Sequence, residues 1–146
     1  MNRIQKMAWL IALSSGTGLF LSTIVTAVLY YRFGFPVANA GFAFLAIAGI
    51  GGFSSIIFRK DPGPVTCDER DRAINSTAAK AGFGGSYMVF GLLCMGIWSI
   101  KGPHAAIDVG VLPMIWMFAG TVAFFVHALT ILILYGRDKT CEGDIK

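Results

Sequence analysis

Charged residues are scarce in this sequence, and they are missing from four long stretches. Only 14% of the 146 residues are charged, against about 25% in an ordinary soluble domain. The stretches without Asp, Glu, Lys or Arg are 8–31, 34–58, 81–100 and 109–136. A helix needs about 20 mainly apolar residues to cross the hydrocarbon core of a bilayer. Soluble helices of this length carry a polar face, which these stretches lack, so the pattern excludes an ordinary soluble domain.

The uncharged stretches predict four membrane spans, at about 8–31, 36–58, 81–100 and 111–135. Lipid offers no hydrogen-bonding partner to the backbone, so each span must be a helix. The chain is therefore predicted to be all-α, an integral membrane four-helix bundle of two transmembrane hairpins that forms one domain. The first stretch is longer than the apolar region of a signal peptide, about 7–15 residues, so we expect it to remain in the protein.

Lys and Arg are distributed unequally around these spans. Ten of the twelve lie on one side, and the other side has only Arg32 and Lys101. Cytoplasmic loops carry an excess of Lys and Arg, so both termini and the segment 59–80 are predicted to face the cytoplasm. Trp9 and Tyr135 would then mark the inner membrane boundary. This bias explains the net charge of +4, and no nucleic-acid partner is expected.

Cysteine and catalytic motifs are also scarce. The three cysteines are Cys67, Cys94 and Cys141, and no two of them form a C-x-x-C pair. The predicted topology places two of them in the reducing cytoplasm and Cys94 in lipid, so no disulfide framework is expected. There is no P-loop, G-x-S-x-G, H-E-x-x-H or dinucleotide fingerprint, and no span contains Asp or Glu. These absences argue against an enzyme and against an ion-coupled transporter, and no cofactor is predicted.

The segment 59–80 is the most charged part of the chain. It contains a Pro-Gly-Pro turn at 62–64, which a helix does not cross. Thr66 and Glu69 match the S/T-x-x-E capping box. We predict a helix that starts near Cys67 and continues into the third span. Three glycines would allow it to bend at the membrane surface: Gly82, Gly84 and Gly85.

The charged run that starts this helix has two interpretations. Its members are Asp68, Glu69, Arg70, Asp71 and Arg72. In the first interpretation, they form a solvated and well-capped helix start. In the second, they form a docking site, for a partner or between subunits, in which Arg and carboxylate groups pair across the interface. The run lacks the spacing of a calcium loop.

The same run, extended by small residues to Lys80 and Phe83, resembles a motif in a family of small prokaryotic membrane proteins. That family is classed as a domain of unknown function. In its members, an Asp-Glu-Arg-rich helix follows the second of four spans and leads into the third. The resemblance implies a multi-pass protein of a prokaryotic inner membrane, and it brings no activity with it.

A few polar residues lie inside the predicted spans. Ser14, Gly18, Ser22 and Thr26 are spaced four apart, so they form one small and weakly polar stripe on the first span. Small residues at this spacing allow two helices to approach closely. The stripe therefore predicts tight helix packing, and the alternative is that its hydroxyl groups line a hydrophilic path.

His127, in the inner half of the fourth span, is the other intramembrane candidate. Ionisable groups within a membrane are functional candidates by default. His127 has four interpretations: a hydrogen bond to a neighbouring helix, proton transfer, a ligand contact and metal binding. Soft sulfur ligands such as Cys94 and Met95 favour Cu(I). No spacing supports a metal site, so none is predicted.

The leading hypothesis from the sequence is a membrane protein that works by assembly and not by catalysis. It would form a homo-oligomer or serve as a subunit of a membrane or cytoplasmic complex, with residues 67–81 as the cytoplasmic contact. One alternative is a small channel or transporter in which the stripe of the first span faces a shared pore. The other is a metal- or redox-handling protein centred on His127 and Cys94.

Overall fold

The computed structural model describes residues 3–58, 69–102, 104 and 106–143, in which helices are the only regular secondary structure. The elements are α1 (Arg3–Phe33), α2 (Phe35–Ala38), the 3₁₀ helix η1 (Asn39–Ala48), α3 (Gly49–Gly52), α4 (Ser54–Ile57), α5 (Glu69–Lys101) and α6 (Val111–Gly143). Four stretches are long and apolar enough to cross a membrane: Arg3–Phe33, Asn39–Ile57, Glu69–Lys101 and Val111–Gly136. The prediction of an all-α chain with four spans is confirmed.

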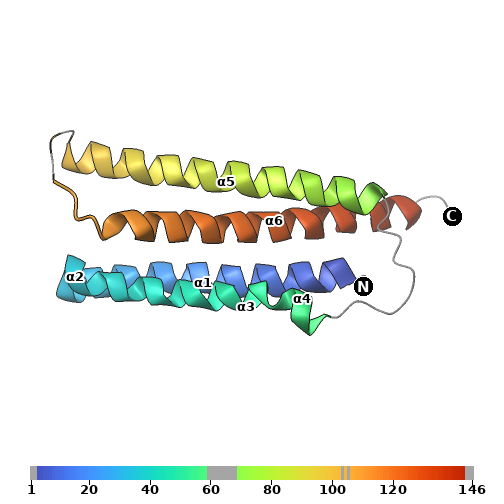
Figure 1. The fold of residues 1–146 in the computed structure, drawn as a ribbon, viewed down its shortest axis with the longest axis horizontal. Coiled ribbons are helices and arrows are strands. Elements are labelled where there is room, and N and C mark those ends of the chain that lie inside the picture. Colours follow the sequence, from blue (N-terminus) through green and yellow to red (C-terminus); the bar gives the residue numbers. More distant parts are fainter. Residues whose placement is uncertain (1–2, 59–68, 103, 105, 144–146) are drawn as a thin grey trace.

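The helices form two antiparallel hairpins that lie side by side (Figure 1). The first hairpin pairs α1 with the second span, which consists of α2, η1, α3 and α4, and the second hairpin pairs α5 with α6. α6 packs against α1 and joins the hairpins, whereas α5 packs against α6 alone among the described elements. The order across the molecule is therefore α5, α6, α1 and the second span. The bundle is open, because its two outermost helices do not meet.

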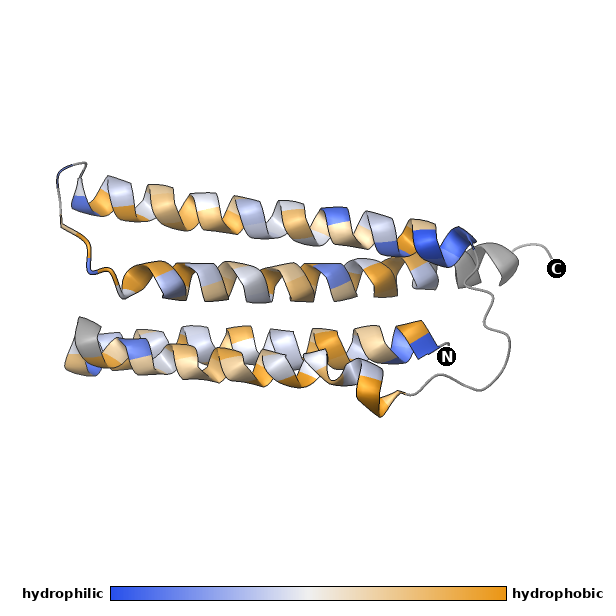
Figure 2. Cartoon of the chain, in the orientation of Figure 1, coloured by the Kyte–Doolittle hydropathy of each residue, from blue (hydrophilic) through white to orange (hydrophobic). Residues whose placement is uncertain are grey.

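The two ends of the molecule differ in polarity. We call the end at which α1 begins and α6 ends the termini end, and the opposite end the turn end. Hydrophilic residues gather at the termini end, where α1 and α5 begin (Figure 2). The placement of this end in the cytoplasm stays a prediction from the distribution of Lys and Arg.

Two glycines end long helices at the turn end. Gly34 has a φ of 81°, in the left-handed region that favours glycine. Its amide donates to the carbonyl of Tyr30 at 3.1 Å, which closes α1 as a left-handed C-cap does. Gly102, with a φ of 84°, ends α5 in the same way and donates to Trp98 at 2.9 Å.

The second span is wound more tightly than an α-helix. Ten of its residues, Asn39–Ala48, form the 3₁₀ helix η1, and 3₁₀ runs of this length are uncommon. A 3₁₀ helix rises about 2.0 Å per residue, against 1.5 Å in an α-helix. The stretch is therefore about 5 Å longer than an α-helix of ten residues would be. This extra length helps a short span to run beside α1, which has 31 residues.

The charged helix and the third span form one helix. α5 runs from Glu69 to Lys101. It passes through Gly82, Gly84 and Gly85 without a break, so these glycines do not end or divide it. The predicted turn at 62–64, the Thr66 cap, the helix start near Cys67 and the residue Asp68 lie outside the described residues.

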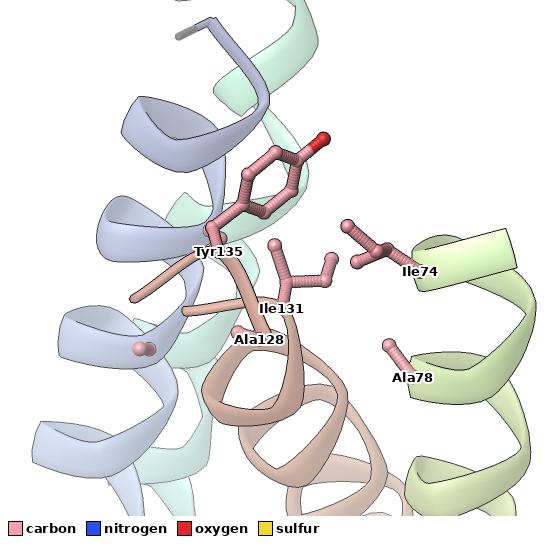
Figure 3. Close-up of a cluster of buried hydrophobic side chains, with 7 residues drawn as sticks. Ile74, Ala78, Ala128, Ile131 and Tyr135 are labelled. Atoms are coloured by element: carbon pink, nitrogen blue, oxygen red, sulfur yellow. The ribbon is translucent and has the colours of Figure 1, made fainter. Parts of the chain in front are cut away.

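A small core at the termini end holds three helices together. Its buried members are Ala8, Ala12, Ile74, Ala78, Ala128, Ile131 and Tyr135. Figure 3 shows Ile131 of α6 facing Ile74 and Ala78 of α5. Four of the seven residues are alanines, which allow close approach of the helices. Such packing is stabilised mainly by van der Waals contact, because lipid is as apolar as these side chains.

Candidate functional site

A cavity of about 250 Å³ lies at the termini end, between α1, α5 and α6. We call it the polar cavity, because four of its nine lining residues carry polar side chains. The polar residues are Asp71, Arg72, Asn75 and His127, and the apolar ones are Ile4, Met7, Ala8, Ile11 and Ile131. It brings together two separate predictions from the sequence, since the charged run and His127 meet in it.

Helical spacing places these side chains on the cavity wall. Asn75 follows Asp71 by four residues and Arg72 by three, so the three lie on one side of α5. His127 and Ile131 are four apart on α6 and share a side in the same way. The antiparallel pairing of α5 and α6 then brings the start of α5 next to the last turns of the fourth span.

Tyr135 fixes the position of Asp71. Its hydroxyl donates a hydrogen bond to Oδ1 of Asp71, and the side chain is buried, with 9% of its surface exposed. Buried tyrosine hydroxyl groups usually find such a partner, and a carboxylate acceptor strengthens the bond. The bond joins the start of α5 to α6. The sequence marked Tyr135 only as a boundary residue, because nothing in it gives the register of two helices.

His127 lies at a close contact between α5 and α6. A Cβ on Gly82 would lie 3.1 Å from the Cβ of His127 and 2.7 Å from the carbonyl oxygen of Ala123. The imidazole is half-buried and lines the polar cavity. It forms no hydrogen bond with another residue in the described part of the chain. The hydrogen bond to a neighbouring helix, one of the four interpretations of His127, is therefore not seen among the described residues.

The structure divides the charged run between two environments. Asp71, which is half-buried, and Arg72, which is exposed, line the polar cavity, whereas the exposed Glu69 and Arg70 do not. Asp68 lies outside the described residues. Only part of the run is therefore a solvated helix start, and only part of it is available to a partner.

The small stripe of α1 lies against the second span. Ser14, Gly18 and Ser22 are buried. A Cβ on Gly51 would lie 2.7 Å from Oγ of Ser14, and one on Gly18 would lie 3.2 Å from the carbonyl oxygen of Phe44. The stripe is therefore the contact surface of the first hairpin. This geometry agrees with tight helix packing.

The far end of the stripe borders a second cavity. Ser22 and Thr26 line about 440 Å³ at the turn end, between α1, the second span, α5 and α6. The other lining residues are mainly apolar. The hydroxyl oxygens of Ser22 and Thr26 are buried, and neither has a hydrogen-bond partner among the described residues. Thr26 faces Gly41, where a Cβ would collide with its hydroxyl oxygen.

The sulfur candidates lie away from His127. Cys94 is twelve residues beyond Gly82 on α5, a distance of about 18 Å along a helix. Met95 is 58% exposed. Over the described ranges, no three His, Cys, Asp or Glu side chains are close enough to hold a metal ion together. The structure gives no geometric support for a site that combines His127 with Cys94.

Comparison with known proteins identifies a family of membrane proteins. Residues 8–138 match the model of a family described as "Predicted membrane protein (DUF2178)". The matched range includes most of α1 and all of the second, third and fourth spans. The resemblance to a family of membrane proteins of unknown function is confirmed. No curated protein and no solved structure matches the chain.

Proposed function

We propose that this chain, which belongs to the DUF2178 family of predicted membrane proteins, functions as a homo-oligomer whose subunits meet through the outer face of α5. The family carries no assigned activity, so the proposal depends on how α5 is packed. The observation that carries it is the exposure of α5 along its membrane part. No residue of α5 after Gly82 is buried, whereas α1 has buried residues from Ala8 to Ser22.

The outer face of α5 carries small residues in a regular pattern. Thr77, Gly84 and Gly91 are seven residues apart, and Trp98 continues the series. Nothing lies within 4 Å of a Cβ built on Gly84 or Gly91. Glycine offers lipid little surface, but it allows a second helix to approach closely. A spacing of seven keeps the series on one side of two helices that cross in a left-handed way.

A second copy of the chain fits this face. Two copies inserted in the same orientation would bring their α5 helices together in parallel, about a two-fold axis along the membrane normal. Arg70 lies seven residues before Thr77 and belongs to the same series, with Glu69 next to it. The pairing would place Glu69 of one copy near Arg70 of the other. This is the cross-pairing of the second interpretation of the charged run, in which the run forms a docking site between subunits.

Cysteine cross-linking in native membranes tests the proposal. Cys94 lies beside the glycine series and is a free thiol. With Cys67→Ser and Cys141→Ser, Cys94 is the one remaining thiol, and mild oxidation should give a dimer. A disulfide needs Cα atoms within about 7 Å, so Thr77→Cys in place of Cys94 should also form one. The matched control is Phe20→Cys, which is 66% exposed on α1.

The control variants distinguish a specific dimer interface from random encounters between monomers in the membrane. Dimers from Cys94 and Thr77→Cys, but not from Phe20→Cys, support the interface. Gly84→Leu and Gly91→Leu should then abolish the Cys94 dimer, because their side chains separate the helices. A monomer under all conditions would contradict the proposal, and so would equal cross-linking at all three positions.

The channel alternative gains no support from the arrangement of one subunit. It requires the stripe of α1 to face a shared pore. The stripe instead lies inside the first hairpin, against η1 and α3. Nothing in the described structure favours the metal or redox alternative over assembly.

A further inference from the structure

The polar cavity presents hydrogen-bond donors that no described residue uses. The side chains of Arg72, Asn75 and His127 line it and form no hydrogen bond within the described part of the chain. His127 is half-buried, whereas Arg72 and Asn75 are exposed at the rim of the cavity. A guanidinium group has five N–H donors, a side-chain amide has two, and a neutral imidazole has one. The carboxylate of Asp71 is engaged by Tyr135 through one of its oxygens. The cavity therefore offers mainly donors, which suit a ligand rich in oxygen acceptors.

Arg72 narrows the class of ligand. The planar guanidinium fork matches a phosphate group, to which it donates two parallel hydrogen bonds. Arg3 and Lys6 are in the first turns of α1, next to Ile4 and Met7 of the cavity wall. Their positive charges add to the attraction of an anion at this end of the molecule.

The walls of the cavity indicate that the phosphate belongs to a lipid. Ile4, Met7 and Ile11 follow one another along α1 and provide about 10 Å of apolar wall. His127 is eight residues before Tyr135 on α6, so it lies about 12 Å deeper in the molecule. Arg72 and Asn75 are outside the uncharged stretch 81–100, at the level where headgroups are expected. A soluble phosphate has no apolar part that could contact this wall, whereas a phospholipid has acyl chains.

We propose that the polar cavity binds the phosphate of a membrane phospholipid. Arg72 holds the phosphate oxygens, and Asn75 donates to one of them. His127 donates to an ester oxygen nearer the acyl chains, which continue along Ile4, Met7 and Ile11. A volume of about 250 Å³ holds a headgroup, and the chains extend into the bilayer. The site is formed within one subunit, so this proposal does not depend on oligomerisation.

Native mass spectrometry of the full-length protein in detergent tests the source of the phosphate. Three probes separate the contributions: dioleoyl phosphatidylglycerol, dioleoylglycerol with the same chains and no phosphate, and glycerol 3-phosphate with no chains. Bound phosphatidylglycerol is expected, without bound dioleoylglycerol and without competition from millimolar glycerol 3-phosphate. Equal binding of dioleoylglycerol would overturn the proposal. Effective competition by glycerol 3-phosphate would assign the site to a soluble phosphate and would also overturn it.

A matched pair of substitutions tests the position. Arg72→Gln removes the charge at the cavity, and Lys80→Gln removes one from a position on the same helix that does not line the cavity. Hydrogen bonds to charged groups contribute enough that Arg72→Gln should weaken phosphatidylglycerol binding about ten- to a hundredfold. Lys80→Gln should change it less than about twofold, because Lys80 does not line the cavity. Equal losses from the two variants would show general attraction to anionic lipid and would overturn the proposal.

Three further variants keep the test valid if Arg72→Gln does not fold. Arg72→Lys keeps the charge and should retain part of the binding. His127→Ala and Asn75→Ala should each weaken it several-fold while the elution volume in size-exclusion chromatography stays unchanged. Unchanged lipid binding in both alanine variants would contradict the assignment of the cavity.

Discussion

Most glycines within the helices of the first hairpin lie against a neighbouring helix, whereas most of those in the second hairpin are open. In the first hairpin, small residues face the partner helix: Gly51 lies against Ser14, and Gly41 lies against Thr26. In the second hairpin, Gly82 and Gly85 face α6 in the same way, but Gly84 and Gly91 have open space beside them. The same residue type therefore marks a contact already made in one place and an unoccupied helix face in another. The difference can be tested by adding side chains at matched positions.

The largest effect is expected at Gly41. A Cβ there would collide with the hydroxyl oxygen and the backbone of Thr26. Gly41→Val should lower the free energy of unfolding by about 3 kcal/mol or more, because overpacking against backbone forces the helices apart. Gly49→Val is the control, since nothing lies within 4 Å of its Cβ position. Unfolding in mixed micelles of increasing SDS content measures both, and equal losses would contradict the packing described for the first hairpin.

On α5, adding a methyl group is expected to change the stability less than at Gly41. The change should destabilise the protein at Gly82 and stabilise it at Gly84. Gly82→Ala places a methyl group 2.7 Å from the carbonyl oxygen of Ala123, and overpacking of this kind costs about 1–3 kcal/mol. Gly84→Ala meets open space and should stabilise the monomer by about 0.4–1 kcal/mol, because alanine lowers the entropy of the unfolded chain. The two melting temperatures, measured in a detergent that keeps the protein monomeric, should lie on opposite sides of the wild-type value. Two shifts in the same direction would contradict the distinction between covered and open glycines.

The bond between Tyr135 and Asp71 should contribute about 1.5–3 kcal/mol, as hydrogen bonds to charged groups do. Tyr135→Phe removes the donor and Asp71→Asn removes the charge of the acceptor. A double-mutant cycle isolates the pair, and the double variant should lose less stability than the sum of the single losses. Strictly additive losses would show that the two groups do not interact in the folded protein.

The smallest effects are expected for two buried hydroxyl groups of α1, those of Ser15 and Ser22. Ser15 donates to the carbonyl of Ile11 at 2.5 Å, so Ser15→Ala should cost about 0.5–1.5 kcal/mol. Ser22 has a buried hydroxyl without a partner among the described residues. Ser22→Ala should therefore be neutral or stabilising, within about 1 kcal/mol. A larger loss at Ser22 than at Ser15 would show that the Ser22 hydroxyl has a partner in the membrane.

The number and nature of the spans could be predicted from the sequence because lipid imposes a simple rule on composition. The order of the helices could not. In a membrane, a face that meets lipid and a face that meets a helix are equally apolar, so no pattern distinguishes the outer side of α5 from the side that meets α6. For the same reason, the sequence does not show that Gly82 and Gly85 face α6. The sequence showed only that these glycines would allow a bend, and the structure has a close contact there with Ala123 and Val126.

The candidate site was predicted only in parts. Intramembrane histidine and a charged helix start are visible in the sequence because both are costly or conspicuous near lipid. Their convergence depends on the register of α5 against α6, which the hairpin loop does not reveal. The partnership of Tyr135 with Asp71, 64 residues apart, depends on the same register. The Thr66 cap and Asp68 lie outside the described residues and stay predictions.

The winding of the second span has a consequence for the angular position of its buried residues. Ala38, Gly41, Leu45, Gly51 and Ser54 are buried. From the first to the last of them is 16 residues, a distance over which an ideal α-helix of 3.6 residues per turn would rotate Ser54 by about 160° away from Ala38. Winding with fewer residues per turn keeps both on the side that meets α1. A change of η1 to an α-helix would therefore do more than shorten the span. It would rotate the last turn of the hairpin out of phase with α1 and expose to lipid the residues that the stripe now covers.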